Sequence, residues 1–449
     1  MICHTPLKKP LATAALALAL SVSAAVSAVE EKGELPLEEL RTFADVFNQI
    51  RIGYVEEIDD STLLKYAIEG MLMGLDPHSV YLTKDAFDDL QSTTSGEFSG
   101  LGLEVGMEDG FVTVISPIDG TPAAKAGLQT GDVILKLDNV SIKGQSLNEA
   151  IEKMRGEKGS EIELLIGRPG ESQPFSVTLV RDIVRMASVR ERWLEPGYGY
   201  IRIAQFQKRT GEDVDNALTK LLEKEELKGL VLDLRNNPGG VLRASVDVAG
   251  LFLDGGTVVY TEGRLENSEM NYQASAGDAS DGTPVVVLIN GGSASASEIV
   301  AGALQDHGRA VLMGTKSFGK GSVQTVLPLS DSRAVKLTTA LYFTPNGRSI
   351  QALGIAPDIL VERAKVTAYN TASRVKEADL AGHLENAGGE TTGAKSDNAR
   401  ENASTLLSTD NQLYEALTLL KGLNILGAYK SREAAQAPVQ SEEEEAAEG

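Results

Sequence analysis

The sequence predicts a multidomain α/β protein, and three observations lead to this class. The chain has 449 residues, which is long for one compact domain, so we expect two or three domains. Short alternating apolar runs fill residues 96–182, as in a small β-rich domain. From 183 to 365, apolar strand patterns alternate with helical ones, which indicates an α/β core.

Residues 29–95 precede these two domains and are predicted to be a helical region. Apolar residues recur there at helical spacing, at Leu37, Leu40, Phe43, Val46, Phe47 and Ile50. A second helix is expected over 62–73, and Asp76-Pro77-His78-Ser79 then breaks the pattern as a structural turn. This region can either cover the next domain or pair with a second copy of the chain, so homodimerisation stays open.

In the β-rich domain, turn residues separate the apolar runs. Strands are expected over 111–115, 133–137, 162–166 and 175–180. Two short helices are expected between them, over 121–127 and 146–154.

The α/β core repeats a buried strand followed by a helix. Strands are expected over 199–203, 230–234, 285–289 and 334–343, and helices over 211–223, 243–251 and 297–304. Residues 366–449 are polar and lose this periodicity. We predict a flexible acidic tail there, with one amphipathic helix over 410–420.

The first 28 residues have the pattern of a secretory signal peptide. Lys8 and Lys9 precede an apolar run over 11–26, and small residues follow at Ser27 and Ala28. The alternative is a membrane anchor, for which the run is short. We therefore expect residues 1–28 to be removed and the mature protein to be exported to the periplasm, with membrane association as the second option.

Composition excludes several function classes. A formal net charge of -22 argues against a nucleic-acid partner, because phosphates need a basic surface. The only cysteine, Cys3, lies within the predicted signal peptide, so the mature chain has no thiol nucleophile, disulfide or cysteine metal ligand. The 4 histidines lack the spacing of metal ligands. We expect no metal and no organic cofactor.

A serine-rich segment, 290–298, follows one buried strand and runs into an apolar helix. A serine at such a junction is exposed, and nearby backbone amides are free to stabilise an oxyanion. Ser295 is the predicted nucleophile, with Ser293 and Ser297 as rivals. The alternative is a serine-rich helix cap without catalytic function.

Lys320 is the predicted base for this serine. It lies 25 residues beyond Ser295, between Gly319 and Gly321. A lysine between glycines is ordinarily a solvated turn residue, but this chain has few histidines, and a Ser–Lys pair can replace a triad. Burial in an apolar pocket lowers the pKa of a lysine far enough for it to act as a neutral base.

Segments 290–298 and 318–324 together resemble the active site of the carboxyl-terminal processing peptidases, also called tail-specific proteases. In that family the serine and lysine are 25 residues apart and a glutamine follows four beyond the lysine, which matches Ser295, Lys320 and Gln324. The resemblance extends over residues 36–365. It implies that Gln324 orients the lysine and that the core has a crotonase/ClpP-like α/β fold.

The turn that ends the strand over 230–234 completes the predicted site. The resemblance implies that an amide of Gly239 or Gly240 joins that of Ala296 in an oxyanion hole, and it leaves open which glycine donates. The alternative is a tight strand-to-helix turn without a catalytic role.

The β-rich domain resembles a PDZ domain. Gly100-Leu101-Gly102-Leu103 resembles the loop by which such domains bind a terminal carboxylate, and a second similar stretch covers 127–134. The resemblance implies protein or peptide substrates with apolar C-termini. An unspecialised β-domain is the alternative, and activation by an adaptor protein stays open.

Two other patterns point elsewhere. Residues 314–321 nearly match a phosphate-binding loop, but Gly321 stands where a serine or threonine must bind magnesium. His307 is an alternative base, but we expect it at the far end of a helix in a capping role.

The rival functions are a non-catalytic periplasmic adaptor and a cell-wall esterase or amidase. The prediction is an exported serine endopeptidase that processes or degrades proteins through their C-terminal tails.

Overall fold

The computed structural model describes residues 36–108, 110–118, 120–265, 268–329, 332–366, 380–384 and 405–436. It divides the chain into two units, Met1–Met71 and Leu72–Gly449. The predicted signal peptide and the acidic run at the end of the chain lie outside the described residues. Within the described ranges, no helix has both the length and the apolar character that a membrane span requires.

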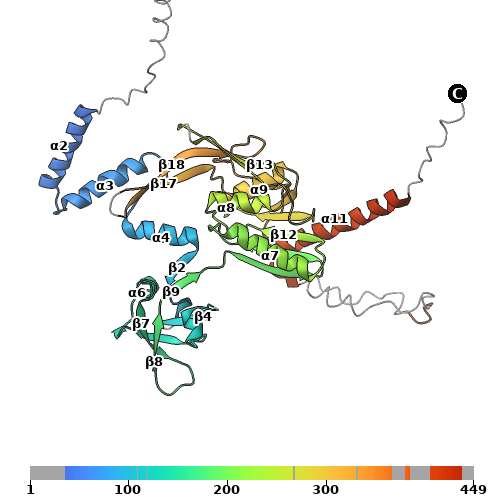
Figure 1. The fold of residues 1–449 in the computed structure, drawn as a ribbon, viewed down its shortest axis with the longest axis horizontal. Coiled ribbons are helices and arrows are strands. Elements are labelled where there is room, and N and C mark those ends of the chain that lie inside the picture. The colour runs from blue at the N-terminus through green and yellow to red at the C-terminus, as the bar shows by residue number, and fades with distance from the viewer. Residues whose placement is uncertain are drawn as a thin grey trace, which may run out of the picture. The chain divides into compact units, whose positions relative to one another are not determined.

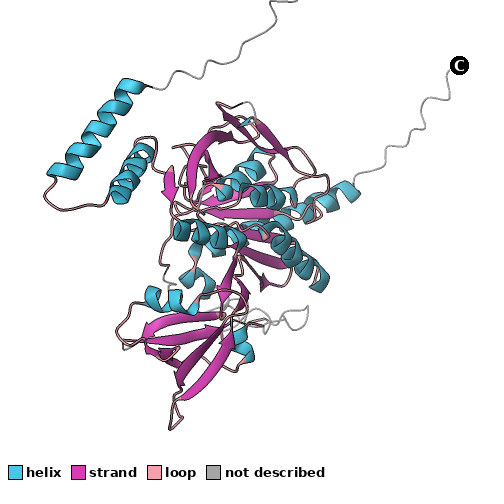
Figure 2. Cartoon of the chain, turned by 60° about the vertical axis from the view of Figure 1, so that its left-hand side comes forward, coloured by secondary structure: helices cyan, strands magenta, loops and turns pink. Residues whose placement is uncertain are grey.

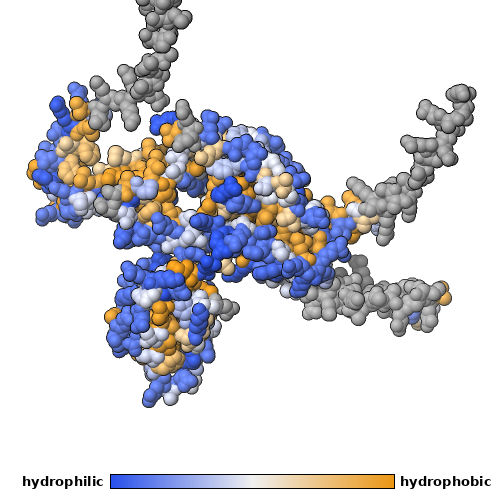
Figure 3. Space-filling model, in the orientation of Figure 1, coloured by the Kyte–Doolittle hydropathy of each residue, from blue (hydrophilic) through white to orange (hydrophobic). Residues whose placement is uncertain are grey.

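The first unit contains helix α2 (Leu37–Gly53) and most of helix α3 (Asp60–Met73). Asp59 precedes α3 and accepts hydrogen bonds from the amides of Ser61 and Thr62, at 3.0 Å each. No side chain of α2 is buried, and Figure 3 shows apolar surface on these helices. The two expected helices are thus confirmed as Leu37–Gly53 and Asp60–Met73.

The second unit begins with a short strand, β1 (Val80–Leu82), and helix α4 (Lys84–Ser95). Two further strands, β2 (Glu97–Gly100) and β9 (Asp182–Arg185), pair in antiparallel fashion. They lie at the beginning and end of the β-rich domain, so the chain enters and leaves this domain through neighbouring strands (Figure 1).

The β-rich domain is an antiparallel sheet in the order β3-β4-β5-β7-β8, with β6 paired to β5. Its elements are β3 (Leu103–Glu108), β4 (Phe111–Pro117), α5 (Pro122–Lys125), β5 (Val133–Leu137), β6 (Val140–Ser141), α6 (Leu147–Met154), β7 (Glu161–Gly167) and β8 (Phe175–Val180). Alternate residues of β7 are buried, namely Ile162, Leu164 and Ile166. This alternation is the period-2 pattern on which the strand prediction depended.

The central sheet of the α/β core has the order β10-β11-β12-β15-β16-β19. Its strands are β10 (Val189–Glu195), β11 (Tyr198–Ile203), β12 (Gly229–Asp233), β15 (Val285–Ile289), β16 (Ala310–Gly314) and β19 (Ile359–Leu360). All pairs are parallel except β10 with β11. Every residue of β12 and β15 is buried, as expected for parallel strands covered on both faces.

Different helices cover the two faces of this sheet. Helices α7 (Thr210–Lys224), α8 (Leu242–Gly250) and α9 (Ala296–Asp306) share one apolar core with the side chains of Leu230 and Leu232. The intervening Val231 points into a second core, with residues of helix α11 (Asn411–Gln436). Figure 2 shows the helices around these strands.

The C-terminal helix differs from the prediction. The sequence indicated a tail over 366–449 with one helix over 410–420, whereas α11 runs over Asn411–Gln436. Its first half packs on the central sheet and buries Leu413, Ala416 and Leu420. The core therefore includes a helix that lies well beyond residue 365 in the sequence.

A second sheet lies in the same unit and was only partly predicted. Its order is β1-β18-β13-β14, with β17 also paired to β18. The predicted strand over 334–343 is β18 (Ala334–Phe343), but β13 (Thr257–Gly263), β14 (Met270–Gln273) and β17 (Ser322–Pro328) were not predicted. Strand β17 matters most, because it carries Gln324.

Candidate active site

The predicted nucleophile lies where β15 ends and α9 begins. Ser295 immediately precedes α9 and has φ 56° and ψ -115°, a conformation that non-glycine residues rarely adopt. Strained residues of this kind persist only where the surroundings hold them, and they cluster at active sites. Ser295 is half-buried and lines a cleft.

The two rival serines serve as structural ties. The Ser293 hydroxyl donates to the Leu234 carbonyl at 2.8 Å, and the Ser297 hydroxyl donates to the Asn237 carbonyl at 2.9 Å. Both side chains are fully buried. Of the three serines, only Ser295 lines the cleft.

Glu298 connects Ser295 with the loop that carries Lys320. Its carboxylate is fully buried and accepts hydrogen bonds from the amides of Ser295 (2.8 Å), Lys320 (2.9 Å) and Gly319 (2.7 Å) and from the Ser317 hydroxyl (2.5 Å). Burial raises the pKa of Glu298, and these hydrogen bonds oppose that rise.

This role of Glu298 was not predicted from the sequence. The available signal was a serine followed three residues later by a glutamate at the start of a helix, the pattern of a capping box. Local spacing alone could not show that the same carboxylate also binds a loop some 20 residues further on.

Lys320 is half-buried in the loop between β16 and β17. Burial lowers its pKa, the neighbouring Lys336 lowers it further, and the carboxylates of Asp76 and Glu298 oppose both effects. Glycine is needed beside it, because a Cβ on Gly321 would lie 2.4 Å from the Gln351 amide nitrogen. The loop can therefore pack closely enough to withdraw the lysine from water.

Gln324 lies on β17 and is held by two hydroxyl groups. Its Nε2 donates to Ser322 Oγ at 3.0 Å and to Thr338 Oγ1 at 3.4 Å. Within the described part of the chain it forms no hydrogen bond with Lys320, although both side chains line one pocket. Its Oε1 has no partner among the described residues.

The glycine turn after β12 lies directly against the nucleophile. A Cβ on Gly239 would lie 2.7 Å from Ser295 Cβ and 2.9 Å from the Ala296 nitrogen, so only glycine fits there. The Gly239 amide donates to Asn237 Oδ1 at 2.9 Å. Among the described residues, the amides of Gly240 and Ala296 have no hydrogen-bond acceptor.

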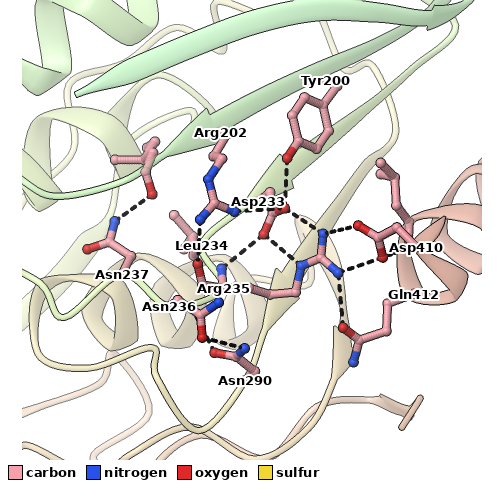
Figure 4. A network of polar contacts seen from close by, with 12 residues as sticks. Tyr200, Arg202, Asp233, Leu234, Arg235, Asn236, Asn237, Asn290, Asp410 and Gln412 are labelled. Atoms are coloured by element: carbon pink, nitrogen blue, oxygen red, sulfur yellow. Dashed lines mark hydrogen bonds and ion pairs between the residues drawn. The ribbon is translucent and has the colours of Figure 1, made fainter. Parts of the chain in front are cut away.

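A buried ion-pair network supports this turn from behind (Figure 4). The fully buried Asp233 ends β12 and binds the Arg235 guanidinium through both oxygens, at 2.9 and 2.7 Å. Arg235 also binds Asp410, at 2.8 and 2.7 Å, just before α11. The Tyr200 hydroxyl donates to Asp233 at 2.8 Å, and burial beside that carboxylate raises the pKa of Tyr200 to about 12.

A pair of asparagines joins the glycine turn to the nucleophile loop. The Asn236 amide donates to Asn290 Oδ1 at 2.9 Å, and Asn290 Nδ2 donates back to Asn236 Oδ1 at 3.0 Å (Figure 4). Asn290 directly follows β15, and Asn236 lies three residues beyond the end of the neighbouring strand β12. The two loops are therefore held in register with each other.

Five of the predicted residues line a single pocket. Ser295, Lys320, Gln324, Gly239 and Gly240 form one part of it. Apolar side chains of α4, β17 and α8 form much of the rest, among them Phe87, Leu90, Val323, Val326 and Leu242. The pocket thus combines a nucleophile, a lysine of lowered pKa and apolar walls.

The predicted carboxylate-binding loop lines a second pocket, in the β-rich domain. Gly100, Leu101, Gly102 and Leu103 lie there with Val105, Ile151, Met154 and Arg155. Leu101 is buried in the domain core, whereas Leu103 is half-buried. An ion pair of 2.7 Å between Asp89 of α4 and Arg155 lies at the same pocket.

The two competing patterns do not lead to other sites. Residues 314–321 connect two strands and begin no helix, unlike a phosphate-binding loop. His307 follows α9, and its Nε2 contacts the Thr257 carbonyl at 2.7 Å, away from the pocket of Ser295. Within the described ranges, no cluster of three histidine, cysteine or acidic side chains could hold a metal ion.

Family models match three parts of the chain. Residues 197–361 match peptidase family S41, and residues 99–179 match a PDZ domain. Residues 13–86 match the N-terminal domain of the activating protease CtpB.

Curated relatives cover most of the chain. It is 47% identical over 391 residues to a carboxy-terminal-processing protease of Bartonella bacilliformis, covering 86% of this chain and 89% of the relative. It is 39% identical over 314 residues to the carboxy-terminal processing protease CtpB of Bacillus subtilis, covering 69% and 65%. Among solved structures, the photosystem II D1 C-terminal processing protease is 34% identical, covering 73% and 87%, with a TM-score of 0.44.

Proposed function

Because the chain belongs to the carboxy-terminal processing proteases, serine-type peptidases that act on C-terminal regions, we propose that Ser295 and Lys320 form its catalytic pair. One observation carries this proposal. The Glu298 carboxylate accepts hydrogen bonds from the backbone amides of both residues and so holds their two segments together beside one pocket.

The chemistry follows from the protonation state of the lysine. Neutral Lys320 accepts the proton of Ser295 while the serine oxygen attacks the substrate carbonyl carbon. The resulting oxyanion accepts hydrogen bonds from the amides of Ala296 and Gly240, because the Gly239 amide is already bound to Asn237. Lys320 then donates the proton to the leaving amine. Water hydrolyses the acyl-enzyme by the same steps in reverse.

Gln324 is proposed to orient the lysine. Its amide nitrogen is bound by the hydroxyls of Ser322 and Thr338, so its carbonyl oxygen is the group available to Lys320. Rotation of the flexible lysine side chain would form this hydrogen bond when substrate fills the pocket.

The β-rich domain is proposed to bind the substrate C-terminus. In the loop Gly100-Leu101-Gly102-Leu103, the amides would donate to the terminal carboxylate. The last substrate side chain would then lie against the apolar residues of the same pocket, Leu103, Val105, Ile151 and Met154. This arrangement selects apolar C-termini.

The proposal also covers the export of the protein, the fold family of its core and its regulatory partners. The pattern of residues 1–28 supports export to the periplasm. Parallel strands with helices on both faces are compatible with a crotonase/ClpP-like core. The match of 13–86 to an activating protease domain supports regulation through the helical region, whether by an adaptor or a second copy of the chain.

Intact mass spectrometry tests the catalytic pair. A loosely folded protein ending in apolar residues is incubated with the mature chain or with Ser295→Ala or Lys320→Ala. We expect cleavage by the native protein and loss of at least about 10³-fold in each variant. Lys316→Ala is the matched control, because this lysine lies exposed in the same loop.

Two results would contradict the proposal. Cleavage that persists in Lys320→Ala would exclude lysine as the base. Binding without cleavage by the native protein, abolished by amidation of the substrate C-terminus, would favour a non-catalytic adaptor.

A further inference from the structure

The turn Asp76-Pro77-His78-Ser79 has no assigned role in the proposed reaction, yet it lies beside the catalytic pocket. The Asp76 carboxylate accepts hydrogen bonds from the amides of His78 (2.8 Å) and Ser79 (3.0 Å) and from the Ser79 hydroxyl (2.6 Å). Ser79 is fully buried. These three hydrogen bonds stabilise the turn itself. Asp76 makes one further hydrogen bond outside the turn.

Among the described residues, Asp59 forms a similar turn without that further hydrogen bond, so the two aspartates can be compared. Asp59 holds Ser61 and Thr62 through the same pattern of amide and hydroxyl donors. Asp76 additionally accepts a hydrogen bond from the Thr338 hydroxyl, at 3.1 Å, across 262 residues of sequence. The Thr338 amide also donates to the Ser79 hydroxyl at 3.1 Å. The second turn is thus fastened to β18.

Thr338 in turn binds Gln324. Because its hydroxyl donates to a carboxylate that can only accept, its oxygen must be the acceptor for Gln324 Nε2, at 3.4 Å. The Ser322 hydroxyl accepts from the same nitrogen. The direction of the hydrogen bonds therefore fixes the amide of Gln324 in one orientation, with its carbonyl oxygen left for the lysine.

We propose that Asp76 is a positioning residue for catalysis, which acts through Thr338 to orient Gln324 toward Lys320. The inference rests on the catalytic pair proposed above and extends its support to the turn that begins the second structural unit. Loss of the chain of hydrogen bonds lets the Gln324 amide rotate, and the lysine then loses its acceptor in the transition state.

Asp76 also acts on Lys320 by its charge. The charged groups around Lys320 are Asp76 in the turn, Glu298 on α9 and Lys336 on β18. Burial is the largest cause that lowers the pKa of Lys320, and Lys336 is the second. The two carboxylates raise this pKa. Lys320 and Lys336 also lower the pKa of His78, after burial. The charge and the hydrogen bond of Asp76 can therefore be separated by substitution.

Two variants of the full-length protein separate them. Thr338→Val breaks the hydrogen-bond chain and keeps the charge, so we expect kcat to fall about 10-fold with KM unchanged. Thr338→Ser restores the hydroxyl and should return kcat to within about 2-fold of the native value. Asp76→Asn keeps an acceptor oxygen and removes the charge. Because Lys320 then loses its proton more easily, the acid limb of kcat/KM should move to lower pH by about half a unit.

Two controls make these results decisive. Lys336→Met removes a neighbouring cation, so it should move the same limb to higher pH. Asp59→Asn alters the equivalent turn of the helical region and should change neither kcat nor the pH profile. Thermal unfolding is measured for every variant, so that loss of fold is recognised as such.

The outcomes distinguish this inference from the function on which it rests. The inference is overturned if Thr338→Val retains native kcat, if Thr338→Ser does not restore it, or if Asp76→Asn and Asp59→Asn behave alike. The catalytic pair itself fails if Ser295→Ala or Lys320→Ala still cleaves, or if the native protein binds substrate without cleaving it. A low kcat of Thr338→Val in a fully folded protein supports the positioning role.

Discussion

Two fully buried carboxylates, Asp233 and Glu298, support opposite halves of the catalytic cleft by different means. Asp233 lies beneath the glycine turn and is neutralised by arginine, with Arg235 at 2.7 Å and Arg202 at 3.3 Å. Glu298 lies beneath the nucleophile and, among the described residues, accepts hydrogen bonds from backbone amides and one hydroxyl. One half of the cleft is held by an ion pair and the other by neutral donors.

The kind of partner that each carboxylate has determines how its half of the cleft responds to pH and to substitution. Four hydrogen-bond donors and the positive end of α9 stabilise the charge of Glu298. Burial still raises the pKa of this residue. An ion pair such as Asp233–Arg235 fails when one partner is removed, because the other charge is then left buried without its counterion.

Glu298→Ala should produce the largest effect. It leaves the amides of Ser295, Gly319 and Lys320 without an acceptor, so the two catalytic segments lose their common tie. We expect kcat to fall by at least about 100-fold and the free energy of unfolding by about 3 kcal/mol. Peptide cleavage and chemical denaturation measure the two effects.

Glu298→Gln is the matched control for this prediction. It retains the side-chain volume and one acceptor oxygen. It should therefore lose less kcat and less free energy of unfolding than Glu298→Ala. Native kcat in the alanine variant would show that the shared carboxylate is dispensable.

Arg235→Met should have the next largest effect on kcat, and its effect on stability should be at least as large as that of Glu298→Ala. It leaves Asp233 buried with the more distant Arg202 as its cationic partner and detaches Asp410. Breaking one partner from a buried pair costs about 3–5 kcal/mol, and we expect kcat to fall about 10-fold as the glycine turn loosens. Arg243→Met, which breaks an exposed pair with Asp247, is the control. Equal stability of the two variants would contradict the prediction.

The smallest effect concerns the pH dependence of stability. The stability difference between the native protein and a neutral variant should change with pH in opposite directions for Glu298 and Asp410. Because the folded state raises the pKa of Glu298, the stability that native protein gains over Glu298→Gln is present at low pH and is lost as pH rises through that raised value. Burial raises the pKa of Asp410, but its hydrogen bonds and charge interaction with Arg235 lower it on balance. The gain over Asp410→Asn is therefore present near neutrality and is lost as pH falls.

Thermal unfolding between about pH 3 and pH 8 measures both differences. Parallel slopes for Glu298→Gln and Asp410→Asn would show that the two carboxylates are held in the same way. A flat response for Asp410→Asn would remove the argument that Arg235 lowers the pKa of its partner.

Local patterns predicted much of the architecture. The strands over 285–289 and 334–343 coincide with β15 and β18, because continuous or alternating apolar runs reflect the burial of the strand faces. Resemblance directed attention to Ser295, Lys320 and Gln324, and all three line one pocket. Strands β13, β14 and β17 were missed, since their sheet leaves many of their side chains partly exposed and weakens the apolar pattern.

The sequence by itself determined the family, the order of the domains' characteristic motifs and the residue types available for chemistry. Only the tertiary structure decided which buried groups hold those residues in place. Arg235 meets Asp410 across 175 residues, and Asp76 meets Thr338 across 262. Such contacts depend on which loops the fold brings to one edge of a sheet, and no local periodicity records them. The supporting carboxylates therefore became visible only when the chain was folded.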